Sequence, residues 1–334
     1  MNENWLKPEF ERALVSVIIP SHNQEAFLPA SLESIADQDY RPIEVIIVDD
    51  GSTDGTRKIM KYFEGIRKEG ITTKCFYQSQ HGAQQARNEG CKLARGEFIQ
   101  FLDGDDVLCP GKLSEQVIVL KTHNDIDVVY GDGQYLVDSG ETQRKGRIIS
   151  IGPSPDIVES LLFGLWVPSF SYLSRRSAIQ RCGPWDNTFM VSQDFEYFLR
   201  LAIRGCRFSY RDGITGFYRK HSFASVSEQS PSILGRTRQR ILVQAEKWLR
   251  QQGEFKEQRV HAAVENYRRI ARQAYPTDKE CFGKSLDEVI RLCPQYLPPK
   301  PRARLIASII GFRNYETLAA MISRIIYKDE KDWF

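Results

Sequence analysis

The chain has 334 residues, of which 41% are hydrophobic and 27% charged, so it has the composition and length of a globular protein with one large domain or two. Its 46 basic and 43 acidic residues leave a formal net charge of only +3, which excludes a global electrostatic attraction to nucleic acid. The 7 cysteines are scattered and form no CxxC pair. This argues against a disulfide framework or a zinc cluster and favours a reducing, cytoplasmic setting.

The sequence contains no pattern typical of an export signal or a membrane span. Its start, MNENWLKPEFERALVSVIIP, lacks a basic beginning, a long apolar stretch and a small-residue cleavage site. The most apolar segments, LLFGLWVPSFSYL and LIASIIGF, are interrupted or far shorter than the ~20 residues that a spanning helix needs. We therefore expect a chain that crosses no membrane.

The first part of the chain alternates short apolar runs with helical patterns, which is typical of a sheet built from βαβ units. The predicted elements are strand 14–20, helix 25–37, strand 44–50, helix 52–63, strand 74–78, helix 83–94, strand 97–102, a helix that starts at Pro110, and strand 127–132. Most of these strands are apolar on both faces. That pattern predicts a mostly parallel sheet with helices on both sides.

Beyond about residue 134 the pattern loosens into shorter strands and a few helices, at IVESLLFG, SAIQRCG and DFEYFLRLAIRG. From about residue 232 the chain is helical and locally basic, and after the proline-rich LCPQYLPPKPRAR it ends in an amphipathic region. We place a domain boundary near Ser230.

Polar residues follow three of the predicted strands at their carboxyl ends, where open α/β sheets bind ligands. They are Ser21, His22 and Asn23, then Asp49 and Asp50, then Asp103, Asp105 and Asp106. A divalent cation and the phosphates it carries would relieve the repulsion among these carboxylates, and hard oxygen ligands suit Mg²⁺ or Mn²⁺. Alternatively, Asp-Gly-Asp-Asp is a turn that leads into a helix. The acidic pair on the neighbouring strand favours the metal and a nucleotide.

Five segments stand in a specific order along the chain: VSVIIPSHN, EVIIVDDGSTDGT, GAQQARNEGCKLARGEFIQFLDGDD, SQDFEYFLRL and FYRKHSFASVS. This series resembles family 2 of the inverting glycosyltransferases, which adopt the GT-A fold. The match runs from about residue 14 to about residue 228 and leaves the rest of the chain uncovered. An ordered series is far more specific than a single motif.

The resemblance implies an α/β fold of GT-A type. We expect a Rossmann-like, mostly parallel central sheet flanked by helices, with a smaller mixed-sheet acceptor half and a helical C-terminal extension. The glycosyltransferase domain would span residues 1–230, with 14–133 as its nucleotide-binding half and 134–230 as its acceptor half. Residues 231–334 would form the extension.

The resemblance also assigns residues to the donor. Pro20, His22 and Asp50 correspond to positions that hold the base and ribose, although His22 stands where many members carry Tyr. Gly82 and Arg87 lie at the start of a helix that could favour an anionic diphosphate. Arg87 could equally be a structural residue that ties the acidic residues together.

The segment Asp103-Gly104-Asp105 matches the DxD motif of the family. The resemblance implies that Asp105 is a direct metal ligand and that Asp103 faces the ribose or reaches the ion through water. His221 matches a histidine that can reach the metal or the diphosphate, and Arg219 has a similar status. Asp106 would cap the following helix. The cofactor would be Mn²⁺ or Mg²⁺.

An inverting transfer needs a base for the incoming hydroxyl, and the resemblance points to Asp194 at the head of a helix. Glu196 is the rival, but positions two apart on a helix point in different directions, so only one should face the site. Asp194 could instead be a helix cap. In addition, Gln193 stands where the family often has an acid.

We therefore expect a metal-dependent, inverting enzyme that moves one sugar from a nucleoside diphosphate donor, UDP-linked by family expectation, to an acceptor hydroxyl in glycan, polysaccharide or glycolipid synthesis. The Gln-x-x-Arg-Trp signature of processive synthases is missing. The alternatives are a non-catalytic sugar-nucleotide binder and a nucleotidyltransferase, although the first strand is not followed by a glycine-rich loop. A receiver domain would leave the DGDD segment and Asp194 unexplained.

The C-terminal helices carry apolar stripes with five cations nearby: Arg302, Arg304, Arg313, Arg324 and Lys328. Such stripes more often form a core or a subunit contact, so we favour that interpretation, including a homo-oligomer. The alternative is a cytoplasmic protein that binds peripherally to the inner face of a membrane through these helices.

Overall fold

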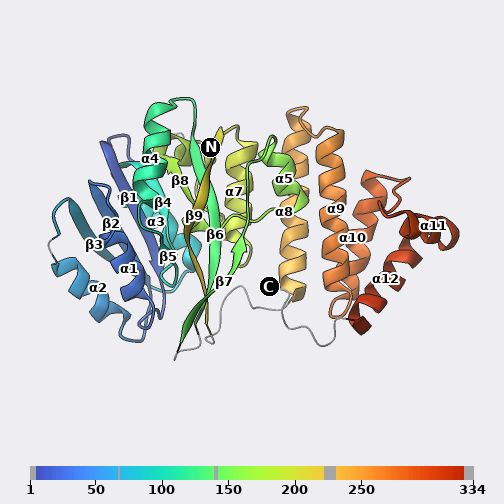
Figure 1. Cartoon of the computed structure of the whole chain (residues 1–334), viewed down its shortest axis with the longest axis horizontal. Coiled ribbons are helices and arrows are strands. Elements are labelled where there is room, and N and C mark those ends of the chain that lie inside the picture. Colours follow the sequence, from blue (N-terminus) through green and yellow to red (C-terminus); the bar gives the residue numbers. More distant parts are fainter. Residues whose placement is uncertain (1–4, 67, 139–141, 222–230, 327–334) are drawn as a thin grey trace. The chain divides into compact units, whose positions relative to one another are not determined.

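A computed structural model describes residues 5–66, 68–138, 142–221 and 231–326 (Figure 1). The chain divides into two compact units. The first comprises Met1–Ile157 and Trp166–Phe223, and the second comprises Val158–Leu165 and Ala224–Phe334. The boundary that we predicted near Ser230 lies outside the described residues.

The first unit is built on one mixed sheet in the order β3-β2-β1-β4-β8-β6-β9-β5. Its first four strands in this order are parallel. They are β1 (Glu11–Ser21), β2 (Ile43–Asp50), β3 (Ile71–Gln78) and β4 (Gly96–Phe101). The helices that connect them are α1 (Leu28–Ala36), α2 (Thr56–Gly65) and α3 (Ala83–Leu93). The predicted alternation of strands and helices is confirmed.

The rest of this sheet is mixed. Strand β8 (Tyr172–Arg175) is antiparallel to both β4 and β6 (Val128–Asp138), whereas β9 (Phe208–Lys220) is parallel to β6. The short β5 (Val107–Leu108) pairs with β9, and β7 (Gln143–Ile149) pairs with the far end of β6. Three further helices belong here: α4 (Lys112–Thr122), α6 (Arg176–Cys182) and α7 (Gln193–Ile203).

The prediction that Pro110 starts a helix was wrong by two residues. Helix α4 begins at Lys112, because Gly111 precedes it in the left-handed conformation with φ +76°. Glycine adopts that conformation without a steric penalty, so the chain turns there before it can enter the helix.

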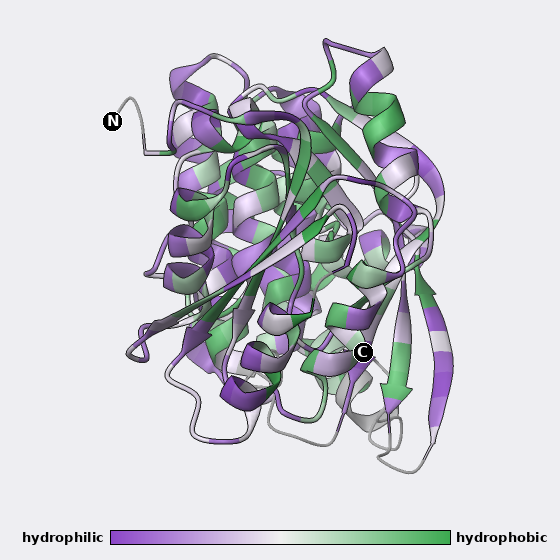
Figure 2. Cartoon of the chain, turned by 90° about the vertical axis from the view of Figure 1, so that its left-hand side faces the viewer, coloured by the Kyte–Doolittle hydropathy of each residue, from purple (hydrophilic) through white to green (hydrophobic). Residues whose placement is uncertain are grey.

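The central strands are buried on both faces, which explains their continuous apolar sequences. Figure 2 shows the hydrophobic colour concentrated on the interior strands and the hydrophilic colour on the outer faces of the helices. One core cluster joins Val15, Val17 and Ile19 of β1 to Leu28 and Leu32 of α1 and to residues from β2, β4 and α4. This packing holds the carboxyl ends of β1, β2 and β4 in a fixed arrangement.

The second unit is helical. It contains most of α5 (Ile157–Phe163), and α8 (Pro231–Gln251), α9 (Glu257–Ala274), α10 (Lys279–Leu292), α11 (Pro301–Ile310) and α12 (Phe312–Ile326). Within the part of the chain that the structure describes, no helix is both long and apolar enough to span a bilayer.

Candidate active site

The predicted donor residues gather at one edge of the sheet. Strands β2 and β4 both pair in parallel with β1, one on each side, so all three end at the same edge. Asp50 is the last residue of β2, and the loop that follows β4 contains Asp103 and Asp105. A Cβ atom placed on Gly104 of that loop would lie 3.6 Å from the carbonyl oxygen of Pro20. The structure therefore brings the ends of these strands together, as the sequence predicted.

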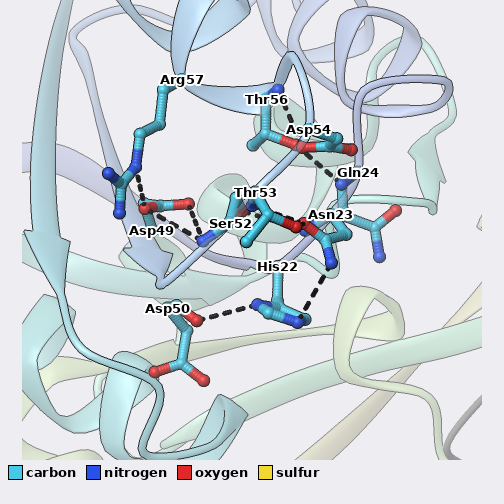
Figure 3. A network of polar contacts seen from close by, with 10 residues as sticks. All are labelled: His22, Asn23, Gln24, Asp49, Asp50, Ser52, Thr53, Asp54, Thr56 and Arg57. Atoms are coloured by element: carbon cyan, nitrogen blue, oxygen red, sulfur yellow. Dashed lines mark hydrogen bonds and ion pairs between the residues drawn. The ribbon is translucent and has the colours of Figure 1, made fainter.

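The two acidic residues at the end of β2 point in opposite directions (Figure 3), as adjacent residues of a strand do. Asp49 is fully buried and pairs with Arg57, with 2.7 Å between carboxylate and guanidinium. It also accepts the Ser52 N–H at 3.2 Å. Asp49 thus stabilises the turn between β2 and α2.

Asp50 is fixed by backbone donors from the start of α3. Its two carboxylate oxygens accept the N–H groups of His81 and Gly82, both at 2.8 Å, and one also accepts from the Gln78 amide at 2.7 Å. Gly82 has φ +96°, a conformation that favours glycine, and it brings the loop over the Asp50 carboxylate. Asp50 is 4% exposed, so it presents only an edge to solvent.

His22 follows β1 and lies beside Asp50 (Figure 3). Its Nδ1 is 2.8 Å from the Asp50 carbonyl oxygen, which fixes the ring. Its Nε2 lies 3.3 Å from the amide nitrogens of Asn23 and Gln80. The outer edge of the ring is thus turned toward exposed polar groups. The Asp54 carboxylate accepts the N–H of Thr56, the first residue of α2, at 3.0 Å.

The acidic loop after β4 is held in place from two sides. On one side, the Ser31 hydroxyl of α1 donates to the carbonyl oxygens of Gly104 and Asp106, at 3.0 and 2.5 Å. On the other, the end of β9 contributes Arg219, whose Nε donates to the Asp105 carbonyl at 2.8 Å. The Arg219 guanidinium also pairs with Asp138 at 2.7 Å and is 2% exposed. The loop is therefore preorganised by main-chain contacts that leave the Asp105 carboxylate available.

His221 lies beside the Asp105 carboxylate, with 3.3 Å between Nε2 and Oδ2. Its ring stacks on Phe27 with 4.4 Å between centroids. These are the two residues that the resemblance assigned to the metal. The structure places them together although 116 positions separate them in the chain.

Asp106 does not cap the following helix, so that prediction was wrong. Its carboxylate turns inward and accepts the backbone N–H of Arg219 at 3.0 Å. Burial, reinforced by the nearby charges of Asp105 and Asp103, raises the pKa of Asp106 well above its ordinary value. Asp106 thus joins the acidic loop to β9.

Arg87 of α3 lies between the acidic loop and the start of α7. It forms an ion pair with Asp103, and its other terminal nitrogen donates to Gln193 at 2.8 Å. The guanidinium lies 4.5 Å from the centre of the Trp185 ring and is 4% exposed. The sequence left two roles open for Arg87, in diphosphate binding and in structure. These contacts fit the structural role, in which Arg87 ties the acidic residues together.

Asp194 lies in the first turn of α7, and its Oδ1 is 4.0 Å from Arg87. That oxygen is buried and has no hydrogen-bond partner among the described residues. Burial and the charge of Asp103 raise the pKa of Asp194 to about 7, although Arg87 acts in the opposite direction. The formal helix cap is Ser192, so Asp194 is not the cap that the sequence left open.

Glu196 points away from Asp194. It forms a two-point ion pair with Arg200, at 2.7 and 3.0 Å, and Arg200 in turn donates to the carbonyl of Pro184. Of the two acids, Glu196 is therefore the one that is engaged by an ion pair within the protein.

Helix α3 has a role that sequence reasoning missed. Asn88 holds the main chain of Trp185 through two hydrogen bonds, at 2.7 and 2.9 Å, and Gln84 donates to the Phe189 carbonyl. The helix therefore clamps the segment that leads into Asp194. The sequence shows that Gln84 and Asn88 lie on one side of this helix, but it does not show which distant backbone groups their amides bind.

The site fits a metal that is shared with a substrate. Among the residues described, no group of three or more His, Cys, Asp and Glu side chains is placed to hold a metal ion. Asp105 and His221 supply two donors, and the phosphates of a nucleotide donor would complete the set. The negative charges of Asp103 and Asp105 act on Asp106, and a cation would relieve this repulsion. Of these three carboxylates, Asp103 pairs with Arg87.

The family model for glycosyl transferase family 2 matches residues 16–192, more than half of the chain. The chain belongs to this family. All predicted donor residues and the acidic loop lie inside the matched part, as does the loop that α3 clamps. Asp194 lies just beyond it and His221 further along the chain.

Curated relatives from this family cover part of the chain. An uncharacterized glycosyltransferase of Nostoc sp. is 30% identical over 178 residues, 52% of this chain and 54% of the relative. The putative teichuronic acid biosynthesis glycosyltransferase TuaG of Bacillus subtilis is 40% identical over 114 residues, 34% of this chain and 42% of the relative. The Escherichia coli UDP-Glc:alpha-D-GlcNAc-diphosphoundecaprenol beta-1,3-glucosyltransferase WfgD is 38% identical over 123 residues, 37% of this chain and 47% of the relative. The chain thus spans about half the length of the curated relatives that it matches.

Solved structures show the fold. S. aureus TarS 1-349 in complex with UDP superposes with a TM-score of 0.64 at 17% identity, over 96% of this chain and 92% of that one. The mannosyltransferase PcManGT of Pyrobaculum calidifontis, in complex with GDP-Man and Mn²⁺, gives a TM-score of 0.54 at 17% identity, over 97% of this chain and 90% of that one. The GT-A fold predicted from the sequence is confirmed.

Proposed function

We propose that this family 2 member is an inverting, metal-dependent glycosyltransferase. It moves one sugar from a nucleoside diphosphate sugar to an acceptor hydroxyl in the synthesis of a cell-envelope glycan. The observation that carries this proposal is the Asp194 carboxylate, which has a raised pKa and a buried oxygen without a hydrogen-bond partner among the described residues. A buried acid with such a pKa is suited to accept a proton near neutral pH.

The donor would lie across the ends of β1 and β2. Pro20, His22 and Asp50 would hold the base and ribose, with Asp103 near the ribose and Gly82 close to the diphosphate. TarS is shown with UDP and UDP-GlcNAc, and the name of WfgD specifies a UDP-Glc donor. PcManGT is shown with GDP-Man. These names support UDP as the first carrier to test, with GDP as the comparison.

Asp194 would act as the base. As the acceptor hydroxyl approaches the anomeric carbon, its proton passes to the Asp194 carboxylate. The acceptor oxygen forms the new bond to that carbon while the bond from the carbon to the phosphate oxygen breaks. The nucleoside diphosphate leaves with the electron pair, and attack from the opposite face inverts the configuration.

Asp105 and His221 would hold the metal, and Asp103 would face the ribose or reach the metal through water. When bound, Mn²⁺ or Mg²⁺ supplies positive charge that stabilises the departing diphosphate. Around it, Arg87 keeps Asp103 in place and Arg219 fixes the main chain of the loop. These contacts would hold the acidic loop in place before the donor binds.

A thermal-shift panel tests the proposal. The full chain is heated with UDP-glucose, UDP-GlcNAc, UDP and GDP-mannose, each with Mn²⁺, with Mg²⁺ and without metal. A ligand that binds only the folded state raises the unfolding temperature, so we expect a metal-dependent rise with at least one UDP sugar. If no nucleotide sugar gives a metal-dependent rise, the proposal is wrong.

A further inference from the structure

Helix α11 (Pro301–Ile310) is apolar on its outer side. The residues that it buries are the small Ala303 and Ala307. Its large aliphatic side chains face outward, with Leu305 64% and Ile309 74% exposed. A helix of a globular protein ordinarily does the reverse and turns its large apolar residues to the core. The folding of the second unit therefore does not account for these side chains.

Helix α12 (Phe312–Ile326) continues the same pattern. It buries the charged Glu316 fully, between Arg268 and Arg272 of α9, at 2.8 and 2.6 Å. It also buries the small Ala320. Its aliphatic side chains Leu318, Met321 and Ile322 are exposed, whereas Phe312 packs against the core of the unit. The exposed aliphatic residues of the two helices and the segment before them are Leu297, Leu305, Ile306, Ile309, Ile310, Leu318, Met321 and Ile322.

We call this surface, together with the cations beside it, the α11–α12 face. The cations are Lys300, Arg302, Arg304 and Arg313, all exposed. Arg313 pairs with Asp287 of α10, whereas Lys300, Arg302 and Arg304 have no carboxylate partner among the described residues. Between residues 297 and 322 the one acidic residue is Glu316, which is buried and neutralised. The face is therefore both apolar and cationic.

We propose that the α11–α12 face lies in the interface of a membrane that contains anionic lipids. Aliphatic side chains flanked by Lys and Arg are the composition of a helix that lies in the plane of a bilayer. At 10 and 15 residues, α11 and α12 are too short to span it. This goes beyond the proposed function, because it concerns where the enzyme works rather than what it transfers.

Charge distinguishes this partner from a second copy of the chain. In a symmetric dimer, the same face from two copies would bring together four cations from each copy, of which only Arg313 has a carboxylate partner among the described residues. An anionic lipid surface instead attracts each cation, at about 1 kcal/mol per Lys or Arg close to the surface. The sequence favoured a core or subunit contact for these helices, and the exposure of the aliphatic side chains now favours the lipid surface.

The test is flotation of the full chain with vesicles of phosphatidylcholine alone and of phosphatidylcholine mixed with phosphatidylglycerol. We expect the chain to float with the anionic vesicles, less with the neutral ones, and less at high salt. Lys300→Gln with Arg302→Gln should weaken binding to anionic vesicles roughly fivefold for each charge removed.

Leu305→Ser with Ile309→Ser should weaken binding by roughly tenfold per side chain, because each aliphatic group then stays in water. The matched control is Ile118→Ser on α4, a side chain with 61% exposure in the first unit, which should float like the parent. The proposal is overturned if the parent does not float, or if the double serine variant floats as well as the parent. It is also overturned if the parent forms an oligomer without vesicles that the double variant disrupts. Flotation needs no turnover, so these outcomes are independent of the proposed reaction.

Discussion

The Oδ1 atom of Asp194 lies 4.0 Å from Nη2 of Arg87, and the same Arg87 nitrogen binds Asp103. One buried cation thus faces two carboxylates from different segments of the first unit. Burial is the largest cause that raises the pKa of Asp194 to about 7, and the negative charge of Asp103 adds to it. Arg87 opposes this rise, but because Asp103 shares the cation, Arg87 offsets only part of it.

The raised pKa predicts how activity depends on pH. Below its pKa Asp194 carries a proton and cannot accept another, so kcat/KM should rise with pH and level off once Asp194 ionises. The acid limb should lie well above 3.8, the ordinary Asp value, and approach 7. A bound cation beside Asp105 would lower it somewhat, since Asp105 contributes to the raised pKa. A limb at 3.8 in the kcat/KM profile would contradict the role of Asp194.

Ionisation of Asp194 should raise activity, but it should lower the stability of the folded state. Because the folded pKa of Asp194 exceeds the unfolded value, the unfolded chain ionises first as pH rises. The free energy of unfolding therefore falls as pH rises from about 4 to about 7, and the loss persists in full above pH 7. Asp194→Asn should raise the unfolding temperature at pH 8 relative to the parent and change it little at the lowest pH where the chain stays folded. An equal change at both pH values would mean that ionisation of Asp194 is not the cause.

Replacing Arg87 tests the shared cation. Arg87→Met keeps volume against Trp185 but removes the charge that lowers the pKa of Asp194, so the acid limb of kcat/KM should move up by roughly 1 unit or more. Arg57→Met is the matched control, because it removes a guanidinium that pairs with Asp49 instead of Asp103. If both variants give the same pH profile as the parent, Arg87 does not tune Asp194.

The proposed metal ligands can be tested without turnover. Asp105→Asn should weaken the Mn²⁺-dependent part of the thermal shift with UDP, by roughly tenfold or more in apparent Mn²⁺ affinity, and His221→Ala should weaken it less. The metal-independent shift with UDP should remain. Asp125→Asn removes an exposed carboxylate elsewhere and serves as control. Unchanged Mn²⁺ dependence in Asp105→Asn would exclude Asp105 as a ligand.

Arg219 should stabilise the folded state and also hold the acidic loop in place. Arg219→Met removes an ion-pair partner of Asp138, whose side chain is 10% exposed, and a donor to the Asp105 carbonyl, at a cost of about 3 kcal/mol in the free energy of unfolding. Arg219→Lys keeps a charge but cannot make both contacts, so it should recover only part of this loss. Denaturant unfolding measures the difference. Equal stability of parent and Arg219→Met would show that the loop does not depend on β9.

The sequence predicted the fold because the pattern of each element was local. Strands such as 14–20 and 44–50 are continuous runs rich in β-branched residues. Such runs are typical of strands that are buried on both faces of a parallel sheet. The placement of Asp50 and the loop of Asp103 at one edge of the sheet also followed from general rules, since parallel strands end at one edge. The resemblance supplied the pairing of Asp105 with His221, which no local pattern contains.

The errors and omissions concern contacts between distant segments. Asp106 looked like a helix cap because it precedes a helix, but β9 places a backbone N–H beside it. Likewise, an Asn in a helix does not reveal that Asn88 binds the main chain at Trp185, 97 positions away. The outward aliphatic side chains of α11 were equally hidden, because an apolar stripe does not show which way a helix faces.

The central claim is that Asp194 is the base of a sugar transfer. The most direct measurement compares Asp194→Asn with Glu196→Gln and the parent, recording both the thermal shift with a UDP sugar and Mn²⁺ and the release of UDP in the presence of acceptor. We predict that Asp194→Asn keeps the thermal shift and loses turnover by ~10²–10⁴-fold, whereas Glu196→Gln retains turnover wherever it stays folded. Turnover by Asp194→Asn at the rate of the parent would contradict the account.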